Sequence, residues 1–238
     1  MAATFGAEVQ RWQETNDPAT TVITLTGAIA IGKTIVLPIQ WVSATETLTG
    51  VVDSKGNTYT IHKNYTLPDA TTHHIAIVAA YATTALAIND TITITWGSPV
   101  YSYRWGAVFY INDAASLGQP DQTATGSHAY GTAISISAAT TVAGTALLGI
   151  VFCITDGITY GSSAWNVSGT THGYGSKEVF YVYYDAASSG TQNPGGTLSA
   201  NDTWGGIWVA LSPMAAGGSI LPLVAFGTLG GNCNPMMG

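Results

Sequence analysis

The sequence predicts an all-β protein: a single β-sandwich of the jelly-roll or double Greek-key type, with about eight to ten antiparallel strands and a Gly/Met-rich C-terminal extension. Three observations support this prediction. Short segments alternate between apolar and polar residues, as in TITITW (91–96). No segment keeps the 3.6-residue apolar spacing of a helix for three turns. Clusters of Gly, Asn, Asp and Ser separate the alternating segments, as turns do.

The strands follow from this alternation. In 91–96, Ile92, Ile94 and Trp96 share one face and the Thr residues share the other. The segment 33–41 alternates in the same way, but Pro38 has no N–H to donate, which predicts an edge strand or a bulge there. The remaining predicted strands are 21–26, 49–53, 57–61, 73–81, 103–111, 132–137, 145–154, 177–184 and 204–211.

Two pairs of segments resemble each other across the chain. Residues 21–41 and 133–152 share a short strand, a turn, a Gly and a long apolar strand. Residues 87–96 and 199–211 share Asn-Asp-Thr beside a Trp-bearing strand. Because no linker separates the two halves, we expect one sandwich over residues 21–212, to which each half supplies four or five strands.

The two ends of the chain differ from this sandwich. We expect residues 1–20 to form an N-terminal arm. Residues 213–238 carry no charge and are rich in Gly, Met and Pro, whereas a solvated tail is normally polar and charged. This segment is either a last strand or a docking tail that binds the sandwich or a neighbouring molecule. Its candidate docking residues are Ile220, Leu221, Leu223, Val224 and Phe226.

Charge and hydropathy exclude two classes of partner. Charged residues make up 8% of the 238 residues, against about 25% in ordinary soluble domains. The net charge is −7 and the six Lys and Arg residues are scattered, so no basic patch can neutralise nucleic-acid phosphates. The longest nearly apolar run, 142–154, is shorter than the roughly 20 residues of a membrane-spanning helix. We therefore expect neither nucleic-acid nor membrane binding.

The compartment follows from two further features. The first twenty residues contain four charged residues and no apolar segment of a secretory signal, so we expect the protein to fold in the cytoplasm. The two cysteines do not make a disulfide framework. Cys153 lies in an apolar segment and Cys233 in the tail, and they are either two separate thiols or a single bridge.

The stretch VVDSKGNTYTI (51–61) contains an oxygen-rich turn that could be a calcium loop or only a hairpin bend. Calcium takes six to eight oxygen ligands, usually including several carboxylates. Here Asp53 is the one carboxylate, and Lys55 would oppose a cation. Gly56 and Asn57 suit the positive φ of a hairpin turn. The turn is therefore better interpreted as architecture, and we expect no metal.

Catalytic and cofactor motifs do not emerge from the sequence. His73 and His74 are neighbours on a strand, so their side chains point to opposite faces and cannot bind one ion together. Gly-x-Ser-x-Gly is absent, and no spaced carboxylate pair suggests glycoside hydrolysis. We expect a protein that is not an enzyme and uses no cofactor.

Aromatic side chains are the most suggestive candidates for recognition. YSYRW (101–105) places Tyr101, Tyr103 and Trp105 on one strand face and Arg104 on the other. Such a group can stack on sugar rings or contribute to a protein interface. These four residues form the candidate recognition patch. The competing interpretation is that the rings fill the core, as some of those in EVFYVYY (178–184) must.

A wider resemblance rests on a few of these residues. A strand ending in Val-x-Asp-Ser-x-Gly-Asn-x-Tyr, followed by Asn-Asp-Thr-Ile-Thr-Ile-Thr-Trp, resembles an uncharacterised β-sandwich module of bacteriophage particle proteins and bacterial surface proteins. The matching positions here are Asp53, Ser54, Gly56, Asn57 and Tyr59, then 89–96 and 201–204. The resemblance implies a jelly-roll-like fold and an extracellular or virion context. It supplies no catalytic residues.

These observations lead to an expected function. We expect a non-enzymatic structural protein of a virus particle, of the phage capsid decoration or head-fibre type. It would be made in the host cytoplasm and reach the exterior by lysis. Its expected partners are the major capsid protein, other virion proteins and further copies of itself. The alternatives are a carbohydrate-binding module or lectin-like adhesin that uses exposed aromatics and, less favoured, a glycan-active enzyme.

Overall fold

The predicted all-β antiparallel sandwich is confirmed. The computed structural model describes residues 2–16, 18–67, 72–98, 103–114, 120–124, 128–135, 139–141, 143–154, 159–161, 166–168, 178–186, 190–192 and 195–214. These residues form 17 strands, more than the number expected, and the pairings between them are antiparallel. Over the same ranges, the search for a helix long and apolar enough to span a membrane found none.

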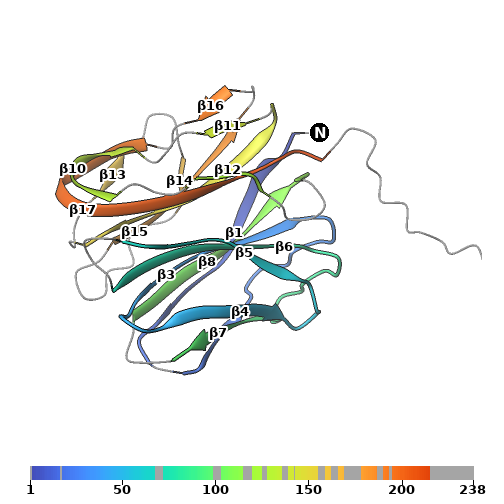
Figure 1. Ribbon diagram of the computed structural model, residues 1–238. Helices are drawn as coiled ribbons and strands as arrows, with labels where there is room; N and C mark the ends of the chain where they lie inside the picture. The colour runs from blue at the N-terminus through green and yellow to red at the C-terminus, as the bar shows by residue number, and fades with distance from the viewer. Residues whose placement is uncertain are drawn as a thin grey trace, which may run out of the picture.

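The first eight strands form two sheets, which we call the N-terminal unit (Figure 1). They are β1 (Thr4–Glu14), β2 (Thr20–Thr24), β3 (Thr34–Val42), β4 (Thr47–Asp53), β5 (Tyr59–Thr66), β6 (His73–Tyr81), β7 (Thr91–Gly97) and β8 (Tyr103–Asn112). One sheet has the order β1-β8-β3-β6-β5 and the other β2-β7-β4. This order follows the jelly-roll pattern except at β5, which pairs with β6 instead of extending the smaller sheet beside β4.

The remaining strands form the C-terminal unit. They are β9 (Pro120–Ala124), β10 (His128–Ser135), β11 (Ala139–Thr141), β12 (Thr145–Cys153), β13 (Tyr160–Gly161), β14 (Asn166–Ser168), β15 (Glu178–Ala186), β16 (Gly190–Gln192) and β17 (Gly195–Leu211). A seven-stranded sheet runs β10-β17-β12-β15-β14, with β9 and β13 also paired to β17. β11 and β16 form a separate two-stranded ribbon.

The two units repeat one strand order. The path β1-β8-β3-β6-β5 recurs as β9-β17-β12-β15-β14, and β2-β7-β4 recurs as β10-β17-β13. The long β17 therefore supplies the counterparts of both β7 and β8. Gly32 (φ 84°) and Gly144 (φ 77°) make the same left-handed turn before the central strands β3 and β12. The predicted likeness of 21–41 to 133–152 is thus a structural repeat.

The second predicted likeness is not a structural one. Residues 89–91 lead into the start of β7, whereas 201–203 lie inside β17. We expected both halves of the chain to contribute strands to one sandwich, but each half forms its own sheets. The main sheets therefore stack in three layers (Figure 1). The five-stranded sheet is the middle layer.

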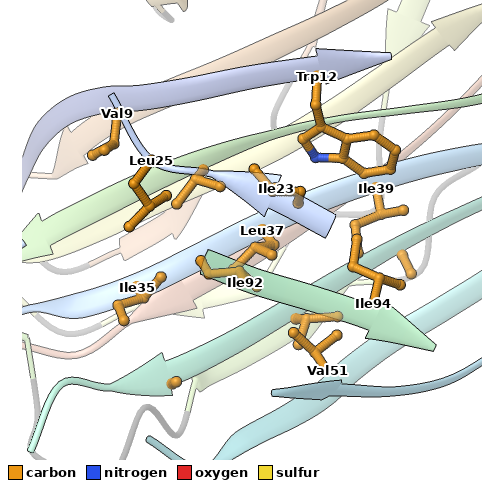
Figure 2. Packing of buried hydrophobic residues seen from close by; sticks show 14 of the residues in the cluster. Val9, Trp12, Ile23, Leu25, Ile35, Leu37, Ile39, Val51, Ile92 and Ile94 are labelled. Carbon is orange, nitrogen blue, oxygen red and sulfur yellow. The ribbon is translucent and has the colours of Figure 1, made fainter. Parts of the chain in front are cut away.

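The first core lies between the five-stranded and three-stranded sheets. Figure 2 shows Ile35, Leu37 and Ile39 of β3 facing Ile92 and Ile94 of β7. The predicted inward face of 91–96 is therefore confirmed. Burying these branched side chains contributes roughly 1.5–3 kcal/mol each before conformational entropy is subtracted.

The second core joins the two units. Val36, Ile77 and Phe109 from the five-stranded sheet pack with Ile150 and Ile207 from the seven-stranded sheet. Strands β3, β6 and β8 are thus buried on both faces, which explains why they read as nearly continuous apolar runs. A third core on the far side of the seven-stranded sheet contains Ile134, Leu147, Val151, Cys153, Phe180, Val182, Leu198, Trp204, Trp208 and Ala210.

The predicted N-terminal arm is wrong, because residues 4–14 form β1 and pair with β8. Register shifts beside Gly6 and Val9 break the two-residue alternation, so the sequence pattern did not reveal this strand. β1 also ties the units together: the Phe5 amide donates to Asp185 Oδ1 at 2.7 Å, and the Phe5 ring stacks on Tyr183 at 3.7 Å.

The position of Pro38 also differs from its prediction. β3 is a central strand, flanked by β8 and β6, not an edge strand. Leu37 and Pro38 pair with β6 on one side, but the β8 ladder is interrupted there and resumes at Ile39. The missing donor of proline is accommodated by this gap, so no bulge is required.

Candidate functional site

The turn after β4 is held by the carboxylate of Asp53. Its Oδ1 accepts hydrogen bonds from the amides of Lys55 (2.8 Å) and Asn57 (3.1 Å), and its Oδ2 accepts from Asn57 Nδ2 and the Tyr59 hydroxyl (both 2.9 Å). A carboxylate offers about four acceptor sites, so these four donors occupy it. Gly56 has a φ of 79°, as a tight turn requires. The predicted hairpin is nevertheless wrong, because β4 pairs with β7 and β5 pairs with β6, so the turn links two sheets. This geometry supports the architectural interpretation of the turn.

Asn57 connects this turn to the loop between β6 and β7. The side chain is buried, and its Oδ1 accepts from the amides of Thr83 and Thr84 (both 2.9 Å), while Nδ2 donates to the Thr84 carbonyl at 3.0 Å. Burial, followed by the neighbouring Asp53 charge, raises the pKa of Tyr59, so its hydroxyl stays a donor at any ordinary pH. The loop is therefore fixed by side-chain bonds.

Replacing Asn57 by Ala removes these bonds and leaves backbone groups of the loop without partners. We expect the free energy of unfolding to fall by about 1–3 kcal/mol. Thermal and urea unfolding would measure the loss. Asn64→Ala, on an exposed part of β5, is the control and should change stability by less than about 0.5 kcal/mol. An unchanged melting temperature for Asn57→Ala would contradict the bracing described here.

Arg104 is the centre of a buried ion-pair cluster. Its guanidinium binds both carboxylate oxygens of Glu46, with Nε donating to Oε2 at 3.1 Å and Nη2 donating to Oε1. Nη1 donates to Glu14 Oε2 at 3.3 Å and to the Pro18 carbonyl at 3.0 Å. The guanidinium carbon lies 4.6 Å from the centre of the Trp96 ring. The bidentate geometry and these further contacts compensate for desolvation.

The surrounding side chains hold this cluster in place. Trp41 Nε1 donates to the Glu46 carbonyl at 3.1 Å, and the Glu46 amide donates to Ser43 Oγ at 3.0 Å. Trp96 Nε1 donates to Thr21 Oγ1 at 2.9 Å, and the Thr21 hydroxyl donates to Glu14. The partners of Arg104 could not be predicted from the sequence, because Glu14, Pro18 and Glu46 lie far from it in the chain. The sequence did indicate that Arg104 has a buried partner, because a charged residue inside an apolar strand is rarely buried unless it is paired.

The predicted recognition patch is wrong for two of its four residues. Arg104 and Trp105 are both fully buried, Arg104 in the ion-pair cluster and Trp105 on the face of β8 that carries Ala107 and Phe109. Tyr103 is half-buried and lies 5.9 Å from the Trp105 ring, between centroids. Tyr101 lies outside the described residues. Strand β8 is buried on both faces because a sheet covers each of them, so its aromatics fill the core.

The aromatics of β15 have the predicted alternation. Tyr181 and Tyr183 belong to the core between the units, whereas Phe180 and Tyr184 belong to the third core. Burial raises the pKa of the Tyr181 phenol, so this group remains protonated.

The adjacent histidines point to opposite faces, as predicted. His73 stacks on Phe152 across the two units, with ring centroids 5.0 Å apart, and His74 stacks on Trp41 at 4.9 Å. His74 Nε2 donates to the Ser43 carbonyl at 2.8 Å, and Nδ1 accepts from Thr66 Oγ1 at 2.9 Å. Among the residues with described positions, no group of three or more His, Cys, Asp or Glu side chains could hold a metal ion.

His74 makes stability depend on pH. Burial lowers its pKa below the ordinary value, although the Ser43 carbonyl and Glu46 oppose the shift. The unfolded chain, with a pKa of about 6.5, therefore binds more protons at mildly acidic pH, and stability falls as the pH drops below that value. Urea unfolding at several pH values should show a weaker decline for His74→Gln. Parallel declines in both proteins would contradict this assignment.

The predicted docking tail cannot be compared with the fold, since residues 215–238 lie outside the described ranges, as does Cys233. The last described residues are anchored: Pro213 bridges to Ala114, and the Met214 amide donates to the Asp113 carbonyl at 2.8 Å. Cys153 is buried in the third core. Comparisons of the chain with family models, curated proteins and solved structures found no match.

Proposed function

We propose that the chain is a non-enzymatic structural protein of a virus particle, of the capsid decoration or head-fibre type. It binds the capsid lattice and stabilises it or displays a surface on it. The observation that carries this proposal is that charged and amide side chains inside the fold bind one another and hold the structure together. Arg104 and Glu46 bind each other in the interior, and Asp53 and Asn57 brace a turn. The side chains best suited to site chemistry are thus occupied with architecture.

The surface supports the same proposal. The outward residues of β2 and β7 are Thr and Val, which can pack against a neighbour without stranding a desolvated charge. The three stacked layers and the shared core between the units suit a protein whose role is mechanical stabilisation of a particle. The proposed partners are the major capsid protein, other virion proteins and copies of the chain itself.

Co-sedimentation with purified capsids tests this function. The full chain should pellet with capsids, whereas a chain that ends at Met214 should bind more weakly if the uncharged tail adds contacts. Ending at Met214 keeps the contacts of Pro213 and Met214 with 113–114. Equal binding by the full chain and the shortened chain would show that the tail has no role in capsid binding. Failure of the full chain to pellet with capsids would contradict the function itself.

Carbohydrate binding is the second candidate, and one residue favours it. Tyr130 on β10 has 74% of its surface exposed, and an exposed tyrosine ring can stack on a sugar. Polysaccharide pull-down that is lost in Tyr130→Ala would support this function. Because Trp105 is buried, Trp105→Ala would disturb the core instead and would not test glycan binding.

A further inference from the structure

The three-stranded sheet of the N-terminal unit has an uncharged outer face. Val22 of β2, Thr93 of β7 and Val52 of β4 lie side by side across the three strands. Val22 and Val52 are each 59% exposed. Their neighbours along β2 and β7 on this face are threonines. The inner face of the same strands, by contrast, is buried in the first core.

This face continues beyond the ends of β2 and β7. Ile29 and Leu86 exchange both backbone hydrogen bonds (2.8 and 2.9 Å) and bury their side chains. Their chain neighbours Ala28, Ala30, Ala85 and Ala87 are exposed. Ile31 and Ile88 are 64% and 58% exposed. We call the outward-facing residues of 20–31, 84–95 and 49–52, with Thr93 among them, the outer face.

The loops that carry the outer face are fixed in position. Besides the bonds from Asn57, the Gly32 amide donates to the Ala82 carbonyl at 2.9 Å and the Ala82 amide donates to the Lys33 carbonyl at 2.8 Å. A surface held in this way loses little conformational entropy when a partner binds.

Charge indicates which partner fits. The segments that form the outer face contain one charged residue, Asp90, and its Oδ1 pairs with Lys55 Nζ at 3.1 Å. The whole chain has a net charge of −7. Two copies that meet through acidic surfaces repel each other, whereas two outer faces bring no like charges together. A copy of the same face presents Thr and Val side chains and one carboxylate that is already paired with Lys55, so the contact buries no unpaired charge.

We propose that the outer face binds the same face of a second copy of the chain, in a two-fold contact of sheet on sheet. From strand spacing and rise, each copy would contribute on the order of 500 Å², below the roughly 800 Å² per partner of stable complexes. The dimer is therefore weak in dilute solution and strengthens where many copies are held together. This proposal does not depend on the virion function.

Sedimentation velocity of the full chain over a wide concentration range tests the proposal. The wild-type protein should show a reversible monomer–dimer equilibrium. Thr93→Lys, at the centre of the face, should weaken association by about tenfold or more, because the two lysines would face each other. Thr60→Lys, exposed on β5 outside the face, is the matched control and should associate like the wild type. Circular dichroism and melting temperature would verify that each variant is folded.

A charge-reversal pair separates this contact from other causes. Thr93→Lys and Thr93→Glu should each stay monomeric alone but associate when mixed, since opposite charges then meet across the two-fold axis. A wild-type protein that remains monomeric at every concentration would overturn the proposal. So would association that both variants retain, which would assign self-contact to another surface. If the wild-type protein did not self-associate but Thr93→Lys lost capsid binding, the outer face would bind a different protein. That result would also overturn the proposal.

Discussion

Replacing Arg104 by Met should lower the free energy of unfolding by about 3–5 kcal/mol, since removing one partner of a buried ion pair leaves the other charge uncompensated. The charge left without a partner would be that of Glu46, which is 1% exposed. Urea unfolding at neutral pH would measure the loss.

The double variant Arg104→Met/Glu46→Leu is the control for this prediction. It removes both buried charges of the pair, and such replacements are often near neutral or stabilising. Glu14 then keeps its bond from the Thr21 hydroxyl and its side chain is 20% exposed, so it tolerates the loss of Arg104. A double variant as unstable as the single one would show that Arg104 acts through packing on Trp96 and not through its charge.

Replacing Phe109 by Ala should cost about 3–5 kcal/mol, the range for removing a large aromatic side chain from a core. Phe109 is fully buried in the core between the units, where its ring contacts Phe5 and Tyr181 at centroid distances of 5.4 and 5.6 Å. Because that core is built from both units, hydrogen exchange should accelerate in β12 as well as in β8.

The control for Phe109→Ala is Tyr130→Ala, which removes an exposed aromatic ring from β10. A surface substitution of this kind should change stability by less than about 0.5 kcal/mol. If Phe109→Ala accelerated exchange in the N-terminal unit alone, the two units would be energetically independent despite their shared core.

The strands with regular alternation could be predicted from the sequence. Residues 91–96 show why: Ile92, Ile94 and Trp96 have one environment, and their threonine neighbours have another. The fully buried strands β3, β6 and β12 were also located, because long apolar runs bounded by turns are typical of strands covered on both faces. Local pattern was sufficient for these elements.

What the sequence could not provide was the pairing of distant segments. β1 was missed because its bulges break the alternation, and the first part of β17 was missed because its polar half reads as loop. Trp105 is fully buried on the face of β8 that carries Ala107 and Phe109, and the C-terminal unit packs on those two residues, which no local pattern encodes. The partners of Arg104 come from three other segments, so that cluster was equally out of reach.

A bend at 53–57 could be predicted from composition, and Asp53 braces one there. That the bend links two sheets and does not close a hairpin depends on the pairing of β4 with β7 and of β5 with β6, which composition does not indicate. The sequence shows that the loop segment 82–89, which forms part of the outer face, is uncharged. That this loop lies beside the end of β2 could be learned only from the strand pairing.

The virion function rests on the presence of this chain in assembled particles. Quantitative mass spectrometry of purified particles, from lysates of cells in which the gene is expressed during infection, tests it most directly. We predict that the chain copurifies with the major capsid protein at a constant, multi-copy ratio through successive density gradients. A chain that stays in the soluble fraction, with none in particles that contain every other structural protein, would contradict the proposed function.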